Sequence, residues 1–410
     1  MRFEYFIAKR LSGHQNKDSI SRPIVKIAVG AVILSMVIML LSVMAGKGMQ
    51  QKIREKISAF AGHMQVVRYD NNQSFLTLRP VALSLELLEE LRSTPGVKSV
   101  SPYITIGGLL KTPNDFEGII FKGIDSTYHW EVFREYVKEG KIPKFESPEM
   151  SDSILISAEL ARRLNLKNGD KVKAYFMRPG NDKPFIRRFT IAAIYQTDFE
   201  DFDRNYILGD LRQARRLYGW NDSLTGGFEI LVRDFGDIDR ITASVNERIP
   251  PLYIAKSIKD LNPLMFDWLS MFDFNILVII GILIFITALN MTTVLLVMIM
   301  ERTRMIGILK TLGATDKQVV RIFLLKAAWI IALGMLAGNI IVWAIYVLQQ
   351  KYGFIRLNPE IYYVKTAPLS APFYWIAGLN LLVMVLILAA LLLPARSIAA
   401  VEPSKVMKFE

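Results

Sequence analysis

Residues that could carry covalent or metal chemistry are sparse in this chain, and their spacing matches no catalytic pattern. The three histidines, His14, His63 and His129, are scattered, and no HExxH, GxSxG or CxxC motif occurs. We expect each histidine to be a surface or strand residue rather than a metal ligand. The acidic run DFEDFD at 198–203 lacks the glycine-centred spacing of an EF-hand, so a solvated loop is favoured over a cation site. No metal site is predicted.

The chain also lacks an internal energy source. It has no GxxxxGK[ST] loop, so it does not bind ATP by a P-loop. Four uncharged apolar runs, at 27–45, 274–300, 327–348 and 371–394, each reach the roughly 20 residues needed to cross a bilayer. Because they contain no Asp, Glu, Lys or Arg, they argue against an ion-coupled transporter. Asn290, Asn339 and Asn380 are expected to bond helices together, and Gly30, Gly334 and Gly338 to permit close helix packing.

One short segment could be displaced by a partner outside the membrane. It comprises residues 301–323, ERTRMIGILKTLGATDKQVVRIF, which we call the elbow. Lys/Arg-rich loops between spans stay in the cytoplasm. Gly313 suits the position just past a helix end, and Thr315 with Gln318 has the form of a capping box. Apolar residues recur along the elbow at Met305, Ile306, Ile308, Leu309 and Leu312. The pattern predicts a helix–turn–helix corner that serves as a docking surface.

The composition bounds the class of protein. The 410 residues are 52% hydrophobic, with a mean hydropathy of +0.29, which indicates a chain that is part membrane and part aqueous. The formal net charge is +12, but much of the excess flanks the apolar runs and no nucleic-acid-binding motif accompanies it, so nucleic acid is excluded as a partner. Because cysteine is absent, the aqueous part must be held by an ordinary core.

Basic residues near the runs place both termini and the elbow in the cytoplasm, and the large block after the first run outside it. The first run is too long for a signal-peptide core, so we expect an uncleaved anchor. The predicted divisions are an amphipathic cytoplasmic leader (1–23), transmembrane helices (24–46, 273–300, 322–349 and 371–394), an outer domain with stalk helices (47–272), a cytoplasmic segment (301–321), an outer loop (350–370) and a cytoplasmic tail (395–410).

The outer block shows interleaved strand and helix patterns, typical of a mixed α/β domain. Strands are predicted at 64–69, 118–123, 153–156, 171–177, 185–195 and 227–232, and helices at 84–92, 158–164, 211–218 and 238–248. The first membrane helix is expected to continue as a stalk, because apolar residues recur at helical spacing as far as Phe60. Residues 178–184 (RPGNDKP) predict a projecting hairpin loop between two strands.

Four stretches carry a family resemblance: LSVMAG at 41–46, ISAELARRLNLKNGDKV at 156–172, ALNMTTVLLVMIMERTRMIGILKTLGAT at 288–315 and PARSIAAVEPSKVMKFE at 394–410. With them the chain resembles, over essentially its full length, the permeases of lipoprotein-releasing (Lol) ABC transporters, within the FtsX/MacB-like permease group. The second stretch is shared with MacB-like relatives. The resemblance implies an α-helical membrane protein of four transmembrane helices, with a mixed α/β periplasmic domain inserted between helices 1 and 2.

The resemblance also implies partners and a location. Such permeases pair with a second permease copy or paralogue and with a cytosolic ABC ATPase dimer, which binds ATP and Mg²⁺, so no cofactor is expected in this chain and it is not itself an enzyme. The substrate is an acylated lipoprotein, extracted from the outer leaflet of the inner membrane of a Gram-negative bacterium and passed to a periplasmic lipoprotein carrier. The sequence leaves open a homodimer or a heterodimer.

Three candidate sites follow from the same resemblance. The ATPase-coupling residues are Glu301, Arg302, Met305, Ile306, Gly307, Leu309, Lys310, Leu312, Gly313 and Ala314. The cavity for the acyl chains is expected at Leu41, Val43, Met44 and Met271. The carrier-docking hairpin is expected at Arg178, Pro179, Pro184 and Phe185, although this loop is shorter than the family hook.

Two alternative functions remain open. A MacB-like mechanotransmitting exporter of peptides or drugs would share the domain, but such permeases usually carry a fused ATPase, which is absent here. An FtsX-like transmitter that signals to a cell-wall hydrolase would share the membrane part, but its outer domain is smaller than residues 47–272.

Overall fold

The computed structural model describes residues 21–69, 76–77, 79–113, 115–145, 149–177 and 183–396. The predicted amphipathic leader and nearly all of the tail lie outside these residues. The chain divides into two compact units. The first comprises Met1–Gln51, Trp268–Arg356 and Thr366–Glu410, and the second comprises Lys52–Asp267 and Leu357–Lys365.

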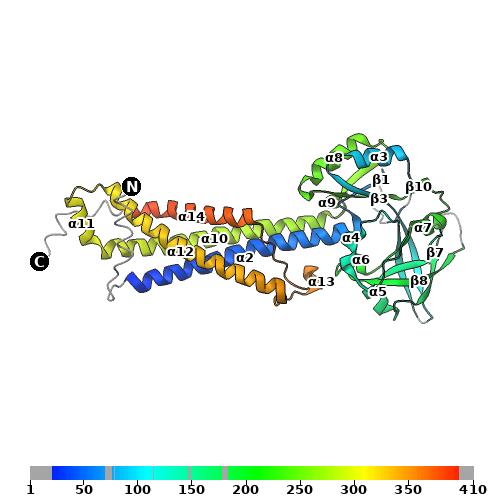
Figure 1. Ribbon diagram of the computed structural model, residues 1–410, viewed down its shortest axis with the longest axis horizontal. Coiled ribbons are helices and arrows are strands. Elements are labelled where there is room, and N and C mark those ends of the chain that lie inside the picture. Colours follow the sequence, from blue (N-terminus) through cyan, green and yellow to red (C-terminus); the bar gives the residue numbers. More distant parts are fainter. Residues whose placement is uncertain are drawn as a thin grey trace. The chain divides into compact units, whose positions relative to one another are not determined.

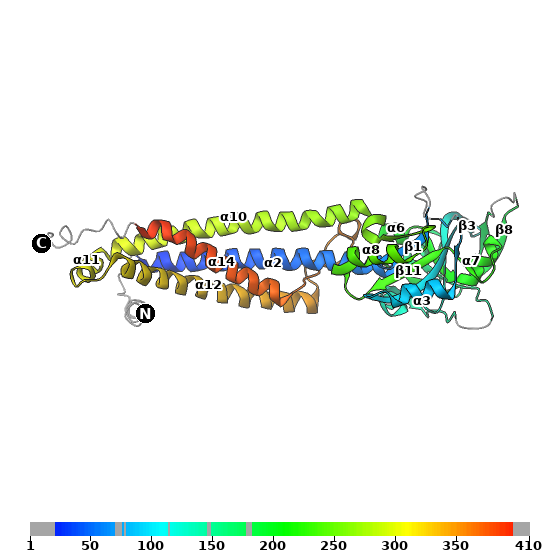
Figure 2. The same cartoon turned by 90° about the horizontal axis from the view of Figure 1, so that it is seen from above.

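The first unit is built from four long helices: α2 (Ser21–Ala61), α10 (Pro263–Glu301), α12 (Asp316–Tyr352) and α14 (Phe373–Ala395). All four are long and apolar enough to cross a membrane, which confirms that the four predicted apolar runs form helices of spanning length. Figures 1 and 2 show the four helices side by side, with the short helix α11 (Thr303–Thr311) between α10 and α12. The outer ends of α2 and α10 are counted with the second unit.

Small and polar residues fix how the membrane helices pack. A Cβ at Gly334 or Gly338 would meet the side chains of Val32 and Met36, at 2.7 and 2.9 Å, so these two glycines let α12 approach α2 closely. Between α12 and α14, Asn339 Nδ2 donates to Asn380 Oδ1 at 2.8 Å, and Asn380 Nδ2 donates back at 3.2 Å. The packing predictions are confirmed for Gly334, Gly338, Asn339 and Asn380. They are wrong for Gly30, where a Cβ would meet nothing within 4 Å, and for Asn290, which is exposed on α10.

Near the stalk, α2 makes close contacts with α10 and with the segment that leads into α14. Gln50, which is 3% exposed, donates from Nε2 to the Leu269 carbonyl at 3.0 Å. Gly48 lies directly against the backbone of the segment that leads into α14, since a Cβ there would collide with Pro368 O and lie 2.9 Å from Ser370 N. The predicted continuation of α2 as a stalk is confirmed, and its apolar residues Ile53, Ile57 and Phe60 are buried.

The second unit is organised around a sheet of ten strands in the order β12-β1-β11-β3-β4-β9-β6-β8-β5, in which β7 pairs with both β3 and β8. This double pairing closes β3, β4, β9, β6, β8 and β7 into a ring filled by one apolar cluster that includes Ile104, Phe121 and Phe189. The ten strands of the whole sheet are β1 (Met64–Arg68), β3 (Val97–Lys111), β4 (Phe116–Ile124), β5 (Val137–Gly140), β6 (Ser153–Ser157), β7 (Lys171–Phe176), β8 (Phe185–Tyr195), β9 (Tyr206–Asp210), β11 (Gly227–Val232) and β12 (Tyr253–Ser257). A separate pair is formed by β2 (Val81–Ala82) and β10 (Leu224–Thr225).

The second unit also contains short helices. They are α3 (Leu85–Ser93), α4 (Trp130–Phe133), α5 (Ala158–Arg163), α6 (Glu200–Asp203), α7 (Leu211–Tyr218), α8 (Ile238–Arg248), α9 (Ile258–Leu261) and α13 (Pro359–Tyr362), with 3₁₀ turns at Arg134–Tyr136 and Phe235–Asp237. Leu87 and Leu91 of α3 and Ile241 and Val245 of α8 form a second core with β1 and β11. Figure 1 shows α3 and α8 together beside β1. The mixed α/β character is therefore confirmed.

Two sequence interpretations are wrong in this unit. The run 198–203 is not a solvated loop: residues 200–203 form α6, and Asp203 is only 6% exposed because its carboxylate accepts the backbone N–H groups of Thr197 and Asp198. His129 is neither exposed nor in a strand; it is buried at the start of α4, where burial lowers its pKa to about 3. His63 is half-buried and accepts the Val232 N–H on Nδ1 at 3.0 Å, and His14 lies outside the described residues.

The close approach at Gly48 makes a first prediction. Gly48→Ala should lower the thermal unfolding midpoint of the detergent-solubilised protein, because overpacking against rigid backbone costs about 1–3 kcal/mol. The matched control is Gly30→Ala on the same helix, where a Cβ meets nothing within 4 Å. The control should be neutral or stabilising, since Ala favours a helix over Gly by about 1 kcal/mol. Equal midpoints for the two variants would contradict the assigned contact.

Candidate functional site

The elbow is a rigid corner rather than a flexible loop. Gly313 adopts φ +92°, its N–H donates to Lys310 O at 3.0 Å, and the Ala314 N–H donates to Leu309 O at 2.9 Å, the bonds of a Schellman motif. One residue further, Thr315 and Gln318 form the predicted capping box at the start of α12. Both predicted end signals are confirmed.

An ion pair braces the two sides of this corner. Lys310 Nζ lies 2.9 Å from Asp316 Oδ1, so the last turn of α11 is joined to the first turn of α12. The pair also places a cation at a helix C-terminus and an anion at a helix N-terminus, where the helix dipoles favour them. The corner is thus held by backbone, side-chain and ionic contacts together.

The predicted coupling residues divide into a buried set and a more exposed set. Ile306 and Gly307 are buried, and Met305 and Ala314 pack against the core of the helix bundle. On the solvent-facing side of the elbow, Leu312 is 80% exposed, and Ile308, four residues earlier, is 50% exposed. The remaining members are exposed (Glu301 and Gly313) or half-buried (Arg302, Leu309 and Lys310). The apolar surface available to a partner is therefore Ile308 with Leu312, and the coupling set from the sequence omitted Ile308.

The four predicted acyl-cavity residues differ in exposure. Met44 and Val43 are buried in the bundle core, and Leu41 packs against it. Met271 is 60% exposed on α10, the helix that the rest of this chain covers least. In the most apolar stretch of α10 only 6% is buried, against 44% for α2. An acyl chain could thus reach Met271 directly, whereas it could reach Met44 only if the helices separated.

The predicted hairpin exists as the antiparallel strands β7 and β8, which pair as far as Phe176 with Phe185. Phe185 is half-buried beneath the Arg187 guanidinium, 5.1 Å from the ring centre, and Pro184 is exposed. Arg178 and Pro179 lie outside the described residues. Carrier docking by this hairpin therefore stays a prediction.

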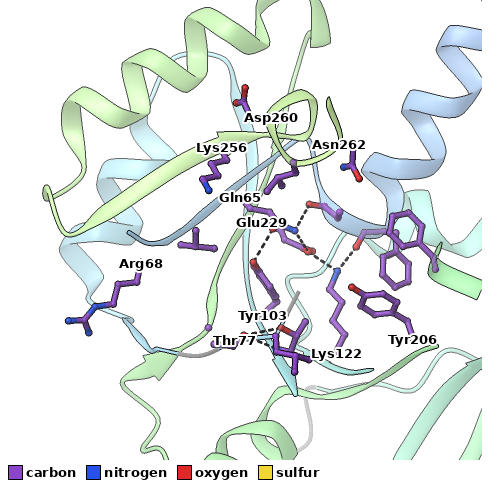
Figure 3. Close-up of a pocket in the computed structure, with 18 of the residues that line it drawn as sticks. Gln65, Arg68, Thr77, Tyr103, Lys122, Tyr206, Glu229, Lys256, Asp260 and Asn262 are labelled. Atoms are coloured by element: carbon purple, nitrogen blue, oxygen red, sulfur yellow. Dashed lines mark hydrogen bonds and ion pairs between the residues drawn. The ribbon is translucent and has the colours of Figure 1, made fainter. Parts of the chain in front are cut away.

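Where α2 ends, the second unit contains a site that the sequence analysis did not identify, which we call the stalk cap (Figure 3). Lys122 of β4 donates from Nζ to the Phe60 carbonyl in the last turn of α2 and pairs with Glu229 Oε1 of β11 at 2.7 Å. The hydroxyl of Tyr128 donates to the carbonyls of Ala59 and Phe60, each at 3.1 Å. Donors thus satisfy carbonyls that an α-helix leaves without internal partners.

The pair in the stalk cap is nearly sealed from water, with Lys122 and Glu229 side chains 3% and 1% exposed. Burial lowers the pKa of Lys122 and raises that of Glu229, and the attraction between them opposes both shifts. Glu229 Oε1 also accepts Gln65 Nε2 at 3.2 Å, and Gln65 Oε1 accepts the Tyr103 hydroxyl at 3.1 Å. This network fixes the end of α2 against two strands of the sheet.

A cavity of about 320 Å³ opens beside the stalk cap. Gln65, Tyr103, Lys122 and Glu229 line it, and Arg68 and Lys256 lie farther out (Figure 3). Among these lining residues, Lys122 and Glu229 bind each other, and Lys122 also binds the end of α2. The sequence held a signal for it: Lys122 and Glu229 are lone charges in the apolar runs GIIFKGI and GFEILV, which become buried strands.

Four helices long enough to cross a membrane, a capped corner between two of them and a mixed α/β domain are the layout of a membrane permease with a large domain outside the bilayer. Family models agree: the MacB-like periplasmic core domain matches residues 27–248, and the FtsX-like permease C-terminal domain matches residues 277–403. Because the first model alone covers more than half of the chain, the protein belongs to the FtsX/MacB-like permease family.

Similar proteins extend over nearly the whole chain. The lipoprotein-releasing system transmembrane protein LolC of Xylella fastidiosa is 23% identical over 422 residues, covering 99% of this chain and 97% of that protein. LolC of Neisseria meningitidis serogroup B is 23% identical over 421 residues, with the same coverage. LolE of Haemophilus influenzae is 21% identical over 425 residues and covers 99% of both chains. The resemblance drawn from the sequence motifs is confirmed.

The Schellman motif of the elbow makes a second prediction. Gly313→Ala places a Cβ in left-handed backbone, a strain of roughly 1–2 kcal/mol. Amide hydrogen exchange across 310–318 should accelerate about 5- to 30-fold, the population change that this strain produces. Gly378→Ala is the control, because its added Cβ meets nothing within 4 Å and its φ is not positive. Unchanged exchange in Gly313→Ala would show that the corner does not depend on this residue.

Proposed function

We propose that the chain is the permease subunit of an ATP-driven ABC complex that extracts lipoproteins from the outer leaflet of the inner membrane, for delivery to the outer membrane through a periplasmic carrier. The observation that carries the proposal is the likeness to Lol permeases along 99% of the chain, at a comparable level for LolC and LolE. The topology proposed with it has cytoplasmic termini and the α/β domain in the periplasm, between the first two membrane helices.

Energy enters this proposed complex at the elbow. The sequence has no P-loop, so ATP and Mg²⁺ would bind to a separate cytosolic ATPase dimer. The elbow offers that partner Ile308 and Leu312 as apolar anchors one helical turn apart, on a corner braced by Lys310 and Asp316. A rigid corner suits the task, because a flexible one would absorb the displacement that it receives.

The strength of a lipid anchor explains why such a complex needs an apolar surface. Each CH₂ of a lipid anchor contributes about 0.8 kcal/mol of membrane affinity, so a triacylated protein does not leave the bilayer unaided. The uncovered face of α10, which includes Met271, Phe274 and Leu277, offers the acyl chains an alternative apolar contact. In a dimer with a second permease copy or paralogue, this face would be enclosed between subunits.

The alternative functions have less support. A MacB-like exporter would share the periplasmic core domain, and an FtsX-like signal transmitter would share the C-terminal permease domain. Neither accounts for relatives named as lipoprotein-releasing proteins that match both regions together. Carrier binding at Pro184 and Phe185 is part of the proposal and rests on the resemblance alone.

Docking at the elbow gives a third prediction. Leu312→Asp should weaken binding of the ABC ATPase that co-purifies with the wild-type chain about 30-fold, the effect of losing a central interface anchor. The measurement is the Kd of the detergent-solubilised chain for that ATPase, with the ATPase rate of the complex beside it.

Thr311→Asp is the matched control, since it adds the same charge at the neighbouring exposed position without removing an apolar side chain. It should bind within about threefold of wild type, a surface substitution being worth under about 0.5 kcal/mol. Equal weakening by both variants would indicate a charge effect and reject Leu312 as an anchor. Tight binding by both would reject the elbow as the docking site.

The proposed substrate gives a fourth prediction. A photo-crosslinking amino acid at Met271 should capture a triacylated lipoprotein and not its unacylated form, because only the acyl chains enter the apolar contact. The same group at Leu336, which is 61% exposed on α12, is the control for random encounter in lipid. Equal capture of both lipoprotein forms at Met271, or equal capture at the two positions, would contradict the role of the α10 face.

A further inference from the structure

The connection between α12 and α14 is built as a hydrogen-bonded hairpin. Gln349, in the penultimate turn of α12, is only 4% exposed; its Nε2 donates to Ala367 O at 3.0 Å, and its Oε1 accepts the Ile355 N–H at 3.0 Å. The two arms then bond to each other, Ala367 N–H to Ile355 O and Leu357 N–H to Lys365 O, each at 2.9 Å. The hairpin therefore extends the end of α12 rather than hanging loosely from it.

The tip of this hairpin, residues 357–365, belongs to the second unit. Lys56, on the stalk part of α2, donates from Nζ to the Tyr363 carbonyl at 2.8 Å and to the Thr197 carbonyl at 2.5 Å. The ring of Tyr363 stacks on Phe199 with centroids 5.0 Å apart and an interplanar angle of 29°. A single buried ammonium thus joins α2, the hairpin tip and the loop that follows β8.

Asp198 completes the junction from the side of the domain. Its Oδ1 lies 3.1 Å from Lys365 Nζ, and its Oδ2 lies 3.8 Å from Lys56 Nζ. The carboxylate is placed by Asp203, which accepts the Asp198 N–H at 2.9 Å and the Thr197 hydroxyl at 2.8 Å. With Lys56 and Asp198 side chains 6% and 16% exposed, these charge-assisted contacts are partly shielded from water.

The backbone is also unusual at this junction. Three non-glycine residues of the described chain have positive φ, and two of them, Asp198 and Tyr363, both at +57°, meet here. Such conformations persist only where surrounding contacts over-determine them, and they cluster at functional positions. For a residue as bulky as tyrosine the conformation is uncommon. The junction is therefore held in place against a local backbone preference.

We propose that Lys56 and Asp198 are positioning residues of a tether that joins α12 to the α/β domain, so that displacement received at the elbow reaches the domain through α12 as well as through the stalk helices. The proposal rests on the proposed function. Its physical basis is continuity: the elbow begins α12, Gln349 joins α12 to the hairpin, and the junction joins the hairpin tip to Lys56 and Asp198.

The test introduces a pair of cysteines, which can be crosslinked selectively because the native sequence has none. In the variant Asp198→Cys/Lys365→Cys the ion pair is lost, and a short bis-maleimide can restore a covalent link across the same two positions. The full chain is reconstituted with its ABC ATPase in proteoliposomes that carry a triacylated lipoprotein, with the carrier outside. We expect ATP-dependent release to fall at least fivefold while the ATPase rate stays within twofold of wild type, and bis-maleimide to restore release to within twofold.

The matched control is Asp239→Cys/Lys259→Cys, which removes another exposed ion pair of the same unit, at 2.7 Å, away from the junction. It should release normally with and without bis-maleimide. Wild-type release by the uncrosslinked junction variant would overturn the tether, and so would a loss that the crosslink fails to repair, because rescue separates positioning from general damage to the fold.

A second measurement separates the tether from the proposed substrate. With no lipoprotein present, ATP should change amide hydrogen exchange in the α/β domain of wild type, the junction variant should lose this change, and bis-maleimide should restore it. If wild type responds in this way but releases no lipoprotein, the proposed function fails and the tether stands. If the junction variant responds as wild type does, the tether fails whatever the substrate.

Discussion

The contact on which the architecture most depends is the buried ion pair of Lys122 and Glu229 at the end of α2. A helix that runs from the bilayer into a folded domain must end with its last carbonyls satisfied, or its end would fray in an apolar environment. Lys122 supplies that donor and Glu229 holds it, each from a different strand. Removing one partner of such a pair typically costs about 3–5 kcal/mol, because the other charge is left buried without compensation. The end of α2 and the sheet are therefore bound to behave as one body.

In the elbow the same requirement is met by local sequence. The elbow needs no distant residue to hold its shape, because Gly313, the Thr315 capping box and the Lys310–Asp316 pair all act within a few residues. Segments that pass on a displacement need stiffness more than chemistry, and both the stalk cap and the elbow have it. In the proposed function the ATPase partner supplies the chemistry, in keeping with a sequence that has no P-loop.

The difference between local and non-local control also decides what the sequence could predict. The four spans, the corner at Gly313 and the helices 211–218 and 238–248 follow from periodicity and capping, and the structure confirms them. The pattern did not reveal β3, β9 or β12, because whether these segments pair depends on neighbours far away in sequence. For the same reason the sequence analysis did not identify the contacts of Lys122, Glu229, Lys56 and Asp198, because their partners are brought to them by the fold. The coupling, acyl-chain and carrier sites stay predictions.

The reciprocal amide pair of Asn339 and Asn380 has a consequence for how force travels between the membrane helices. Each amide both gives and receives a hydrogen bond, so the pair is satisfied at one register of α12 against α14 and at no neighbouring one. Sliding by a helical turn, about 5.4 Å, would break both inter-helix bonds, although each NH2 group would keep its bond to a carbonyl of its own helix. The pair therefore favours one axial register of α12 against α14, so that the two helices tend to move together along their axes.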